Sequence, residues 1–148
     1  VFLFFGLVAV MGSYFLYAQQ LPLVHFLGAI TIGLLSTTVL HLNNMRDRVQ
    51  DQKVGKNTLA VMLGQHGALR YHNILFGCSI LSWLGYLLLS HAEPILFMSC
   101  LAFLPLLAHF IKVQKTKNHI LLDPQLKVVA LSTFLLSVLF FTIAYVTI

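Results

Sequence analysis

The residues best suited to chemistry lie in one short charged stretch between two apolar runs. Asn43, Asp47 and Asp51 are spaced four residues apart, and the two aspartates are half of the four acidic residues in the chain. In a helix this spacing places the three side chains along one stripe, with about 6 Å of rise between neighbours. Two carboxylates arranged in this way repel each other unless a cation lies between them. The stretch is therefore a candidate cation site.

The chemistry that this stripe favours is the binding of a hard divalent cation. Carboxylate and amide oxygens are ligands that Mg²⁺ accepts, and Mg²⁺ usually completes its shell with water and substrate phosphate. Flanking cations could take up the remaining phosphate charge: Arg46, Arg48, Lys53 and Lys56. A plainer alternative stays open, because Arg48 and Asp51 are three residues apart and could be an ion pair on a solvated helix end.

These side chains must be positioned by helices that cross a membrane. Of the 148 residues, 59% are hydrophobic and 9% are charged, which is too little polar surface for a water-soluble globule of this size. The apolar runs are continuous rather than alternating, so they predict helices instead of barrel strands. We expect an all-α bundle of about five spans, folded as a single domain over residues 1–148. The runs long enough, or nearly so, to cross about 30 Å of hydrocarbon are 1–18, 22–42, 71–90, 94–111 and 128–148.

The second span should continue as a helix beyond the membrane surface. Residues 39–53 contain no Gly or Pro, and Gly55 should end the helix that they form. Asn57 or Thr58 could cap a short apolar segment, 59–63, which is too short to span and should lie at the interface or dip into the bundle. The Asn and Asp stripe would then lie just outside the hydrocarbon.

The placement of positive charge predicts which side of the membrane carries this stripe. All nine Lys and Arg residues fall within 46–70 and 112–127, whereas the connections 19–21 and 91–93 carry none. By the positive-inside rule both basic connections are cytoplasmic, which places the N-terminus and the charged stretch inside. The lysines of the second connection are expected to lie near anionic lipid head groups, with a role in drawing in an anionic substrate as the alternative, and no nucleic acid is expected as a partner.

The histidines are the other polar residues of the apolar runs. His25, His41 and His109, three of the seven histidines, lie in or beside predicted spans. His25 and His41 are near opposite ends of one helix, so they could not clamp one haem iron together. We expect each histidine in a span to hydrogen-bond a neighbouring helix instead. His72 is one of those expected in loops or at span ends.

The charged stretch also resembles a known family. The run N-N-M-R-D-R-V-Q-D-Q-K-V-G-K-N-T-L-A-V-M-L-G, residues 43–64, resembles the second aspartate-rich motif of the UbiA superfamily of intramembrane prenyltransferases. Its N-N-x-R-D-x-x-x-D-x-x-x-G-K-x-T-L-A-V form is similar to the branch that transfers a polyprenyl group to 1,4-dihydroxy-2-naphthoate, giving demethylmenaquinone in menaquinone biosynthesis. The five expected spans would fit the C-terminal half of a nine-helix fold of that family.

The resemblance implies an enzyme in which Mg²⁺, bound by two aspartate motifs, holds the diphosphate of a long isoprenoid. Asp47 and Asp51 would be the catalytic metal ligands, and Asn43 a supporting metal ligand. The implied partners are polyprenyl diphosphate, the aromatic acceptor dihydroxynaphthoate and membrane lipid, in a bacterial cytoplasmic membrane. The residues implied to bind substrate are Asn43, Asn44, Arg46, Lys53 and Lys56.

The sequence departs from the family at the first aspartate motif, which is absent. The other acidic residues are Glu93, expected on the opposite membrane side, and Asp123, which stands alone. We therefore expect a partial chain that lacks the N-terminal half of the same protein and is inactive by itself. Two rival interpretations are a fragment of a cation transporter and a non-catalytic membrane subunit. A cation transporter is expected to have ionisable residues near the middle of its spans, and no Asp, Glu, Lys or Arg lies in the middle of the predicted spans.

Overall fold

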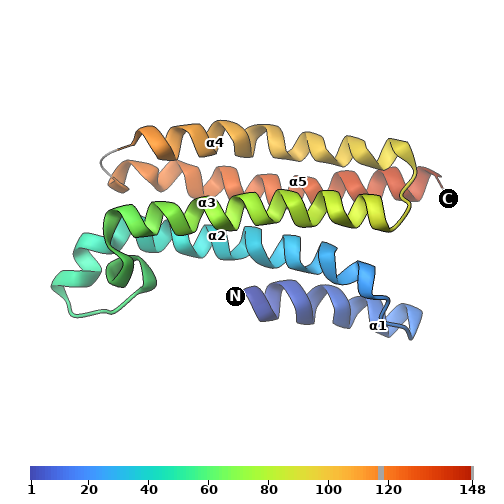
Figure 1. Ribbon diagram of the computed structural model, residues 1–148, viewed down its shortest axis with the longest axis horizontal. Coiled ribbons are helices and arrows are strands. Elements are labelled where there is room, and N and C mark those ends of the chain that lie inside the picture. The colour runs from blue at the N-terminus through green and yellow to red at the C-terminus, as the bar shows by residue number, and fades with distance from the viewer. Residues whose placement is uncertain (117–118, 148) are drawn as a thin grey trace.

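Long helices make up most of the computed structural model, which describes residues 1–116 and 119–147 (Figure 1). No strand occurs among these residues, so the predicted all-α class is confirmed. The chain begins with a π-helix and a short α-helix, continues through two helices of 31 residues each, and ends with two further apolar helices. In chain order the elements are η1 (Phe2–Met11), α1 (Gly12–Ala18), α2 (Leu23–Lys53), α3 (Leu59–Leu89), η2 (Pro94–Ala102), α4 (Phe103–Lys115), η3 (His119–Leu122) and α5 (Asp123–Thr147).

Within residues 1–116 and 119–147, four helices are long and apolar enough to cross a membrane: α2, α3, the continuous pair η2 and α4, and α5. The run Phe2–Ala18 is a shorter apolar helix. The predicted multi-span bundle is thus built from four helices of spanning length and one shorter segment. α5 begins at Asp123, five residues before the predicted start at 128, and residue 148 lies outside the described residues.

The helix α2 continues beyond the apolar run, as the sequence predicts. Its 31 residues correspond to about 46 Å, whereas the hydrocarbon of a bilayer is about 30 Å thick. The surplus is the charged stretch 43–53, which we treat as lying outside the membrane-spanning part. The helix ends at Lys53, and Gly55 follows with a φ of +73°. The left-handed backbone at Gly55 turns the chain back toward the bundle.

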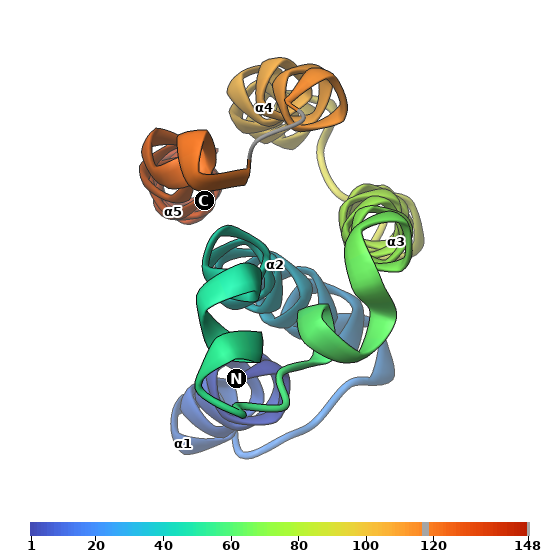
Figure 2. The ribbon, with the colours of Figure 1, turned by 90° about the vertical axis from the view of Figure 1, so that its left-hand side faces the viewer.

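The helix α3 begins with a capped turn and is then interrupted. The Thr58 hydroxyl accepts a hydrogen bond from the Val61 amide at 3.3 Å, which confirms one of the two predicted caps. Gly64 has φ 66° and ψ −177°, a conformation that is essentially restricted to glycine, and it separates the first turns from the rest of the helix. Figure 2 shows this short segment lying to one side of the main column of α3.

Small residues bring the N-terminal segment close to α2. A Cβ atom added at Gly6 would lie 2.6 Å from the Gly33 Cα and 2.8 Å from the Ala29 carbonyl oxygen. Neither distance is possible between real atoms, so η1 and α2 approach each other backbone to backbone at this position. The same test at Gly12 finds open space. The close approach therefore includes Gly6 and does not extend to Gly12.

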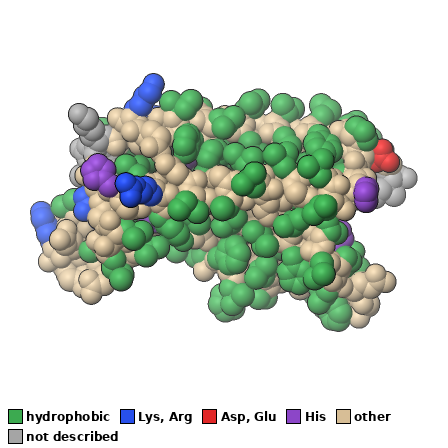
Figure 3. Space-filling view, viewed as in Figure 1, with side chains coloured by type: hydrophobic (Ala, Val, Ile, Leu, Met, Phe, Trp, Pro, Cys, Tyr) green, Lys and Arg blue, Asp and Glu red, His purple; other side chains and the backbone are tan. Residues whose placement is uncertain are grey.

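The core lies where α2 contacts α3 and α5, with α4 packed against α5 on the outer side (Figure 2). The α2–α3 and α4–α5 connections are at one end of the bundle, on the left in Figure 1. The Lys and Arg side chains visible in Figure 3 gather at that same end, and hydrophobic side chains cover the middle of that face. Fully buried apolar residues of the core include Leu35, Leu42, Leu87, Leu106, Val129 and Leu136.

Candidate functional site

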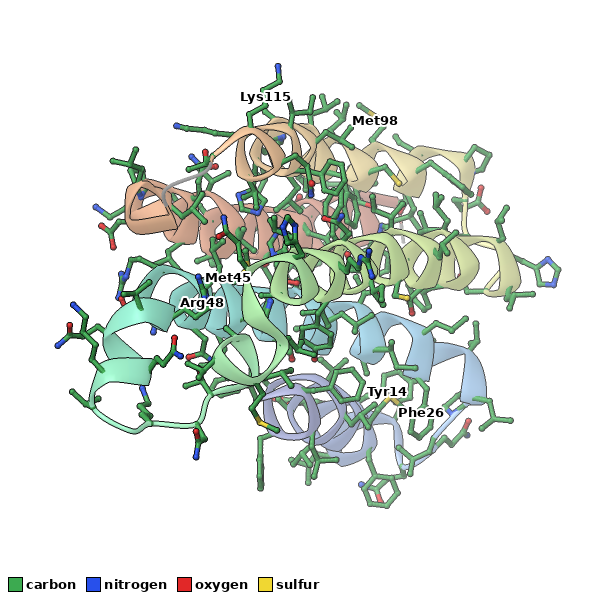
Figure 4. All side chains as sticks on the ribbon, turned by 60° about the vertical axis from the view of Figure 1, so that its left-hand side comes forward. Tyr14, Phe26, Met45, Arg48, Met98 and Lys115 are labelled. Carbon is green, nitrogen blue, oxygen red and sulfur yellow. The ribbon has the colours of Figure 1, made fainter. Side chains whose placement is uncertain are left out.

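Asn43, Asp47 and Asp51 lie on one stripe of α2, at its polar end. The two aspartates differ in exposure, because the Asp51 side chain is 10% exposed whereas the Asp47 side chain is 36% exposed. Figure 4 labels Arg48 and Met45 in this part of α2, while Tyr14 and Phe26 lie toward the other end of the bundle. The candidate site therefore has a buried inner carboxylate and a half-buried outer one.

Arg46 joins the outer part of the stripe into one network. Its Nε donates to the Oδ1 atom of Asp47 at 2.7 Å, and its Nη2 donates to the Oδ2 atom of Asp47 and to the Oδ1 atom of Asn43, both at 2.8 Å. Its Nη1 donates to the Oδ1 atom of Asp123. The Arg46 hydrogen bonds hold the pKa of the Asp47 carboxyl below its ordinary value. Asp47 is consequently a carboxylate at neutral pH.

The contact with Asp123 corrects an expectation from the sequence. Asp123 was expected to stand alone, but it is the first residue of α5 and forms an ion pair with Arg46, 77 residues earlier in the chain. The only sequence signal for this pair was the prediction that both basic connections lie on one side of the membrane. Such a signal places two segments on the same surface without choosing which residues meet.

Asp51 pairs with Lys56 instead of Arg48, the partner that the spacing in the sequence suggested. Its Oδ1 atom is 3.3 Å from the Nζ of Lys56, and its backbone carbonyl accepts from the Lys56 amide at 2.8 Å. Among the described residues, no hydrogen-bond partner lies near its buried Oδ2 atom or near the buried Nε of Arg48. No Arg48–Asp51 ion pair forms within the described part of the chain. The alternative of a simple three-residue ion pair is therefore wrong.

The remaining predicted residues lie beside this network without joining it. Asn44 is partly buried, whereas Lys53 is exposed at the last residue of α2. Lys56 is also exposed, in the connection between α2 and α3. Of the residues predicted to bind substrate, the structure brings Asn43 and Arg46 into direct contact and places Lys56 against Asp51.

The oxygen atoms fit part of the shell of a hard divalent cation. Asn43 and Asp47 direct three oxygens at one guanidinium, and the Oδ2 atom of Asp51 is a buried acceptor with no partner. Over residues 1–116 and 119–147, however, no three His, Cys, Asp or Glu residues are grouped so that they could hold a metal ion. The donors are of the type that Mg²⁺ accepts, and they would leave other positions to water, phosphate or ligands from elsewhere.

A second polar cluster, the histidine network, ties the helices together inside the bundle. The Nε2 of His41 donates to the Ala68 carbonyl at 2.9 Å, the Nε2 atoms of His72 and His109 are 3.1 Å apart, and the Nδ1 of His109 is 3.1 Å from the Oε1 of Gln125. A carbonyl oxygen only accepts, so in the neutral rings His109 carries its proton on Nδ1 and accepts from His72. All three histidines are buried.

This network settles two expectations about histidine. The predicted hydrogen bonding of His41 and His109 to neighbouring helices is confirmed. The placement of His72 at a span end is wrong, because α3 begins well before residue 71 and His72 is fully buried within it. No spacing along the chain indicates that residues from four different helices would meet.

A cavity of about 640 Å³ opens between α1, α2, α3 and α5, away from the acidic stripe. Its lining is mainly apolar and aromatic, and the sequence did not predict it. His25 lies in it between two tyrosines, with ring centroids 4.4 Å from Tyr14 and 5.8 Å from Tyr86. Other aromatic lining residues are Tyr17, Trp83 and Phe140.

Helices of spanning length, with an arginine-bridged acidic cluster at one end, define a multi-span helical membrane protein. Residues 1–120 match the model of the UbiA prenyltransferase family, and the chain belongs to that family. The chain is 38% identical over 141 residues to a 1,4-dihydroxy-2-naphthoate octaprenyltransferase of Haemophilus influenzae, an alignment that covers 95% of this chain and 46% of the relative.

Other relatives are similar over a shorter part of the chain. A 1,4-dihydroxy-2-naphthoate octaprenyltransferase of Escherichia coli is 49% identical over 51% of this chain and 24% of its own length. The UbiA prenyltransferase domain-containing protein 1 of Homo sapiens is 34% identical over 49% of this chain and 22% of its own length. The chain spans about half the length, or less, of the curated relatives that it matches. No solved structure matches it.

Proposed function

We propose that these residues form the C-terminal part of a prenyltransferase. The complete protein would transfer a polyprenyl group from polyprenyl diphosphate to 1,4-dihydroxy-2-naphthoate, giving demethylmenaquinone. The observation that carries the proposal is that the Asn43 and Asp47 oxygens converge on the guanidinium of Arg46, on the same stripe as the buried Asp51 carboxylate. The relatives named for this reaction in two bacteria support the choice of substrates.

In this proposal the carboxylates serve a divalent cation, for which we propose Mg²⁺. Asp47 and Asp51 would hold it, with Asn43 as a supporting ligand, and a second acidic motif in the other half of the protein would complete the site. When bound, the cation neutralises charge that develops on the departing diphosphate. Basic and amide side chains around the stripe would hold the diphosphate itself: Asn44, Arg46, Lys53 and Lys56.

The apolar bundle has its own part in the reaction. The bond between the allylic carbon and the diphosphate oxygen breaks, and its electron pair leaves with the diphosphate. An electron-rich ring carbon of the acceptor then supplies the pair for the new carbon–carbon bond, and the ring loses its carboxylate as CO₂. The immediate product is the quinol form of demethylmenaquinone, and its oxidation to the quinone is a separate step. Because the allylic carbon becomes cation-like, water would capture it if it could enter. Helices with apolar interiors exclude that water.

We further propose that the acidic stripe faces the cytoplasm from a bacterial cytoplasmic membrane. The support is that the two basic connections lie at one end of the bundle (Figures 1 and 3). Positive charge of this kind is retained on the cytoplasmic side during insertion. Lysines there would also lie close to anionic lipid head groups, which attract them.

The test is prenyl transfer by membranes that contain the full-length protein. Asp47→Asn and Asp51→Asn should each lower turnover of polyprenyl diphosphate and 1,4-dihydroxy-2-naphthoate by at least about 100-fold, because a neutral amide is a much poorer metal ligand. Glu93→Gln is the matched control, since it changes an exposed carboxylate in the connection after α3. Full turnover by the Asp variants would reject the metal-ligand role of the two carboxylates, whereas no turnover by the wild-type protein would favour a non-catalytic membrane subunit.

A further inference from the structure

We infer that Arg46 is an exchangeable counter-ion of the acidic stripe, and that Asp123 is a positioning residue that retains Arg46 when a divalent cation takes its place at Asp47. This inference rests on the proposed function, because it assigns a role in metal and diphosphate binding. It goes further by giving a task to Asp123, which lies outside the motif that marks the family.

The first step is that Arg46 occupies the atoms that a metal ion would need. Its guanidinium binds both oxygens of Asp47 at 2.7 and 2.8 Å and the oxygen of Asn43 at 2.8 Å. A divalent cation on the same oxygens would sit within a few ångströms of the guanidinium, and two positive charges at that distance repel strongly. The cation and Arg46 therefore compete for Asp47.

The second step concerns where Arg46 goes when it leaves Asp47. Asp123 binds Nη1, whereas Asp47 binds Nε and Nη2, so the two carboxylates use different nitrogens of one guanidinium. Asp123 comes from α5 and its side chain is 64% exposed. It can keep its hydrogen bond while the other side of the fork is released. Asp123 then stabilises the displaced arginine more than the engaged one, because the displaced arginine no longer shares its charge with Asp47.

The third step is what the released arginine can do. With Nε and Nη2 free, Arg46 presents the planar fork that binds phosphate in a bidentate manner. The Oδ2 atom of Asp51 is buried and has no hydrogen-bond partner within the part of the chain that the structure describes, so it offers the incoming cation one ligand. Cation binding and diphosphate binding are then coupled, because the diphosphate takes up the arginine that the cation displaces. By linkage each ligand should raise the affinity of the other.

The experiment measures Mn²⁺ binding to the full-length protein in detergent, without substrate, from the electron paramagnetic resonance signal of free Mn²⁺. Arg46→Gln removes the competitor and should tighten Mn²⁺ binding about fivefold, the scale of a half-exposed ion pair. Arg46→Lys keeps the charge but loses the fork, so it should tighten binding less. Lys115→Gln is the control, because it removes an exposed cation that points away from the bundle on α4 (Figure 4).

A double-mutant cycle isolates the part played by Asp123. Asp123→Asn should weaken Mn²⁺ binding about threefold in the wild-type background and have no effect in the Arg46→Gln background. An equal loss in both backgrounds would mean that Asp123 only adds negative charge, and would overturn its positioning role. Adding inorganic pyrophosphate should tighten Mn²⁺ binding less in Arg46→Gln than in wild type.

Failure of this inference is distinguishable from failure of the proposed function. Unchanged or weaker Mn²⁺ binding by Arg46→Gln and Arg46→Lys, in a protein that still transfers prenyl groups, overturns the counter-ion role alone. The expected Mn²⁺ pattern in a protein without prenyl transfer supports the counter-ion role and rejects the enzymatic proposal. Absence of Mn²⁺ binding in the wild type and in Arg46→Gln overturns both.

Discussion

The acidic end of α2 and the histidine network are both polar, but their hydrogen bonds are satisfied in different ways. At the acidic end, one guanidinium serves Asn43, Asp47 and Asp123, while an oxygen of Asp51 has no partner. In the network, His72, His109 and Gln125 from three helices are matched donor to acceptor, and His41 donates to the Ala68 carbonyl. The first region has bonds that can be exchanged for a ligand, whereas the second has bonds that hold helices in place.

The surroundings explain this difference. Inside a bilayer no water replaces a lost hydrogen bond, so polar groups there are stable only when they are neutral and paired. The charged stretch of α2 extends beyond the hydrocarbon, where released groups can be solvated. A site that must bind and release a charged substrate is therefore expected at the end of the helix rather than in its middle.

The largest effect should come from removing divalent cations. Chelation with EDTA should abolish prenyl transfer by the full-length protein, a loss of at least about 100-fold, and Mg²⁺ should restore it. The midpoint of thermal unfolding should change little, since no residue of the histidine network is among the proposed cation ligands. Activity that survives chelation, or a chelator that unfolds the protein, would break the distinction between the two regions.

Loss of a histidine of the histidine network should lower the stability of the protein while leaving its turnover nearly unchanged. His109→Leu removes the hydrogen bonds of His109 with His72 and Gln125, so we expect the free energy of unfolding to fall by about 2–3 kcal/mol. Thermal unfolding in detergent measures this change, with exposed His66→Leu as the control. Turnover per folded molecule should stay near the wild-type value. A further Gln125→Leu change should recover part of the loss, and the idea is wrong if the two costs simply add.

The close approach of η1 and α2 offers a comparison within the apolar part. Gly6→Ala forces a Cβ against the backbone of Gly33 and should destabilise the protein by about 1–2 kcal/mol. Gly12→Ala, in open space, should be neutral or slightly stabilising. Both variants are compared with wild type by thermal unfolding. Equal midpoints for the two would show that this packing does not contribute to stability.

The smallest effect is expected at the start of α3. Thr58→Ala removes a hydrogen bond of 3.3 Å to the Val61 amide and should cost about 0.5–1 kcal/mol, while Thr58→Ser should restore most of it. Amide hydrogen exchange of residues 59–63 is the suitable measurement, because the change is local. Faster exchange throughout α3 would contradict a purely local role for the cap.

Local rules predicted the features that depend on neighbouring residues. The extension of α2 through Lys53 and the cap at Thr58 follow from helix propensity and capping chemistry. The Arg48–Asp51 pair was wrong, because the positive φ of Gly55 turns the chain so that Lys56 reaches Asp51 instead. Helical spacing alone could not predict that Lys56, which lies beyond the end of α2, would take this place.

Contacts between distant helices could not be predicted. The pairing of Arg46 with Asp123 and the burial of His72 depend on how α5, α4 and α3 are placed around α2. One sequence fixes which faces are apolar, but it leaves the rotation and height of each helix open. A shift of a single helical turn would separate these pairs while preserving every local pattern.

The interruption of α3 at Gly64 has a genetic consequence. Any other amino acid there must adopt φ 66° and ψ −177°, at a strain of about 1–3 kcal/mol. No neighbouring atom blocks the added side chain, so the penalty comes from the backbone alone. With such a penalty a variant protein can still fold at low temperature, but it loses its folded state more readily on warming. Substitutions of Gly64 are therefore expected to produce temperature-sensitive alleles, which a screen for heat-sensitive growth would recover.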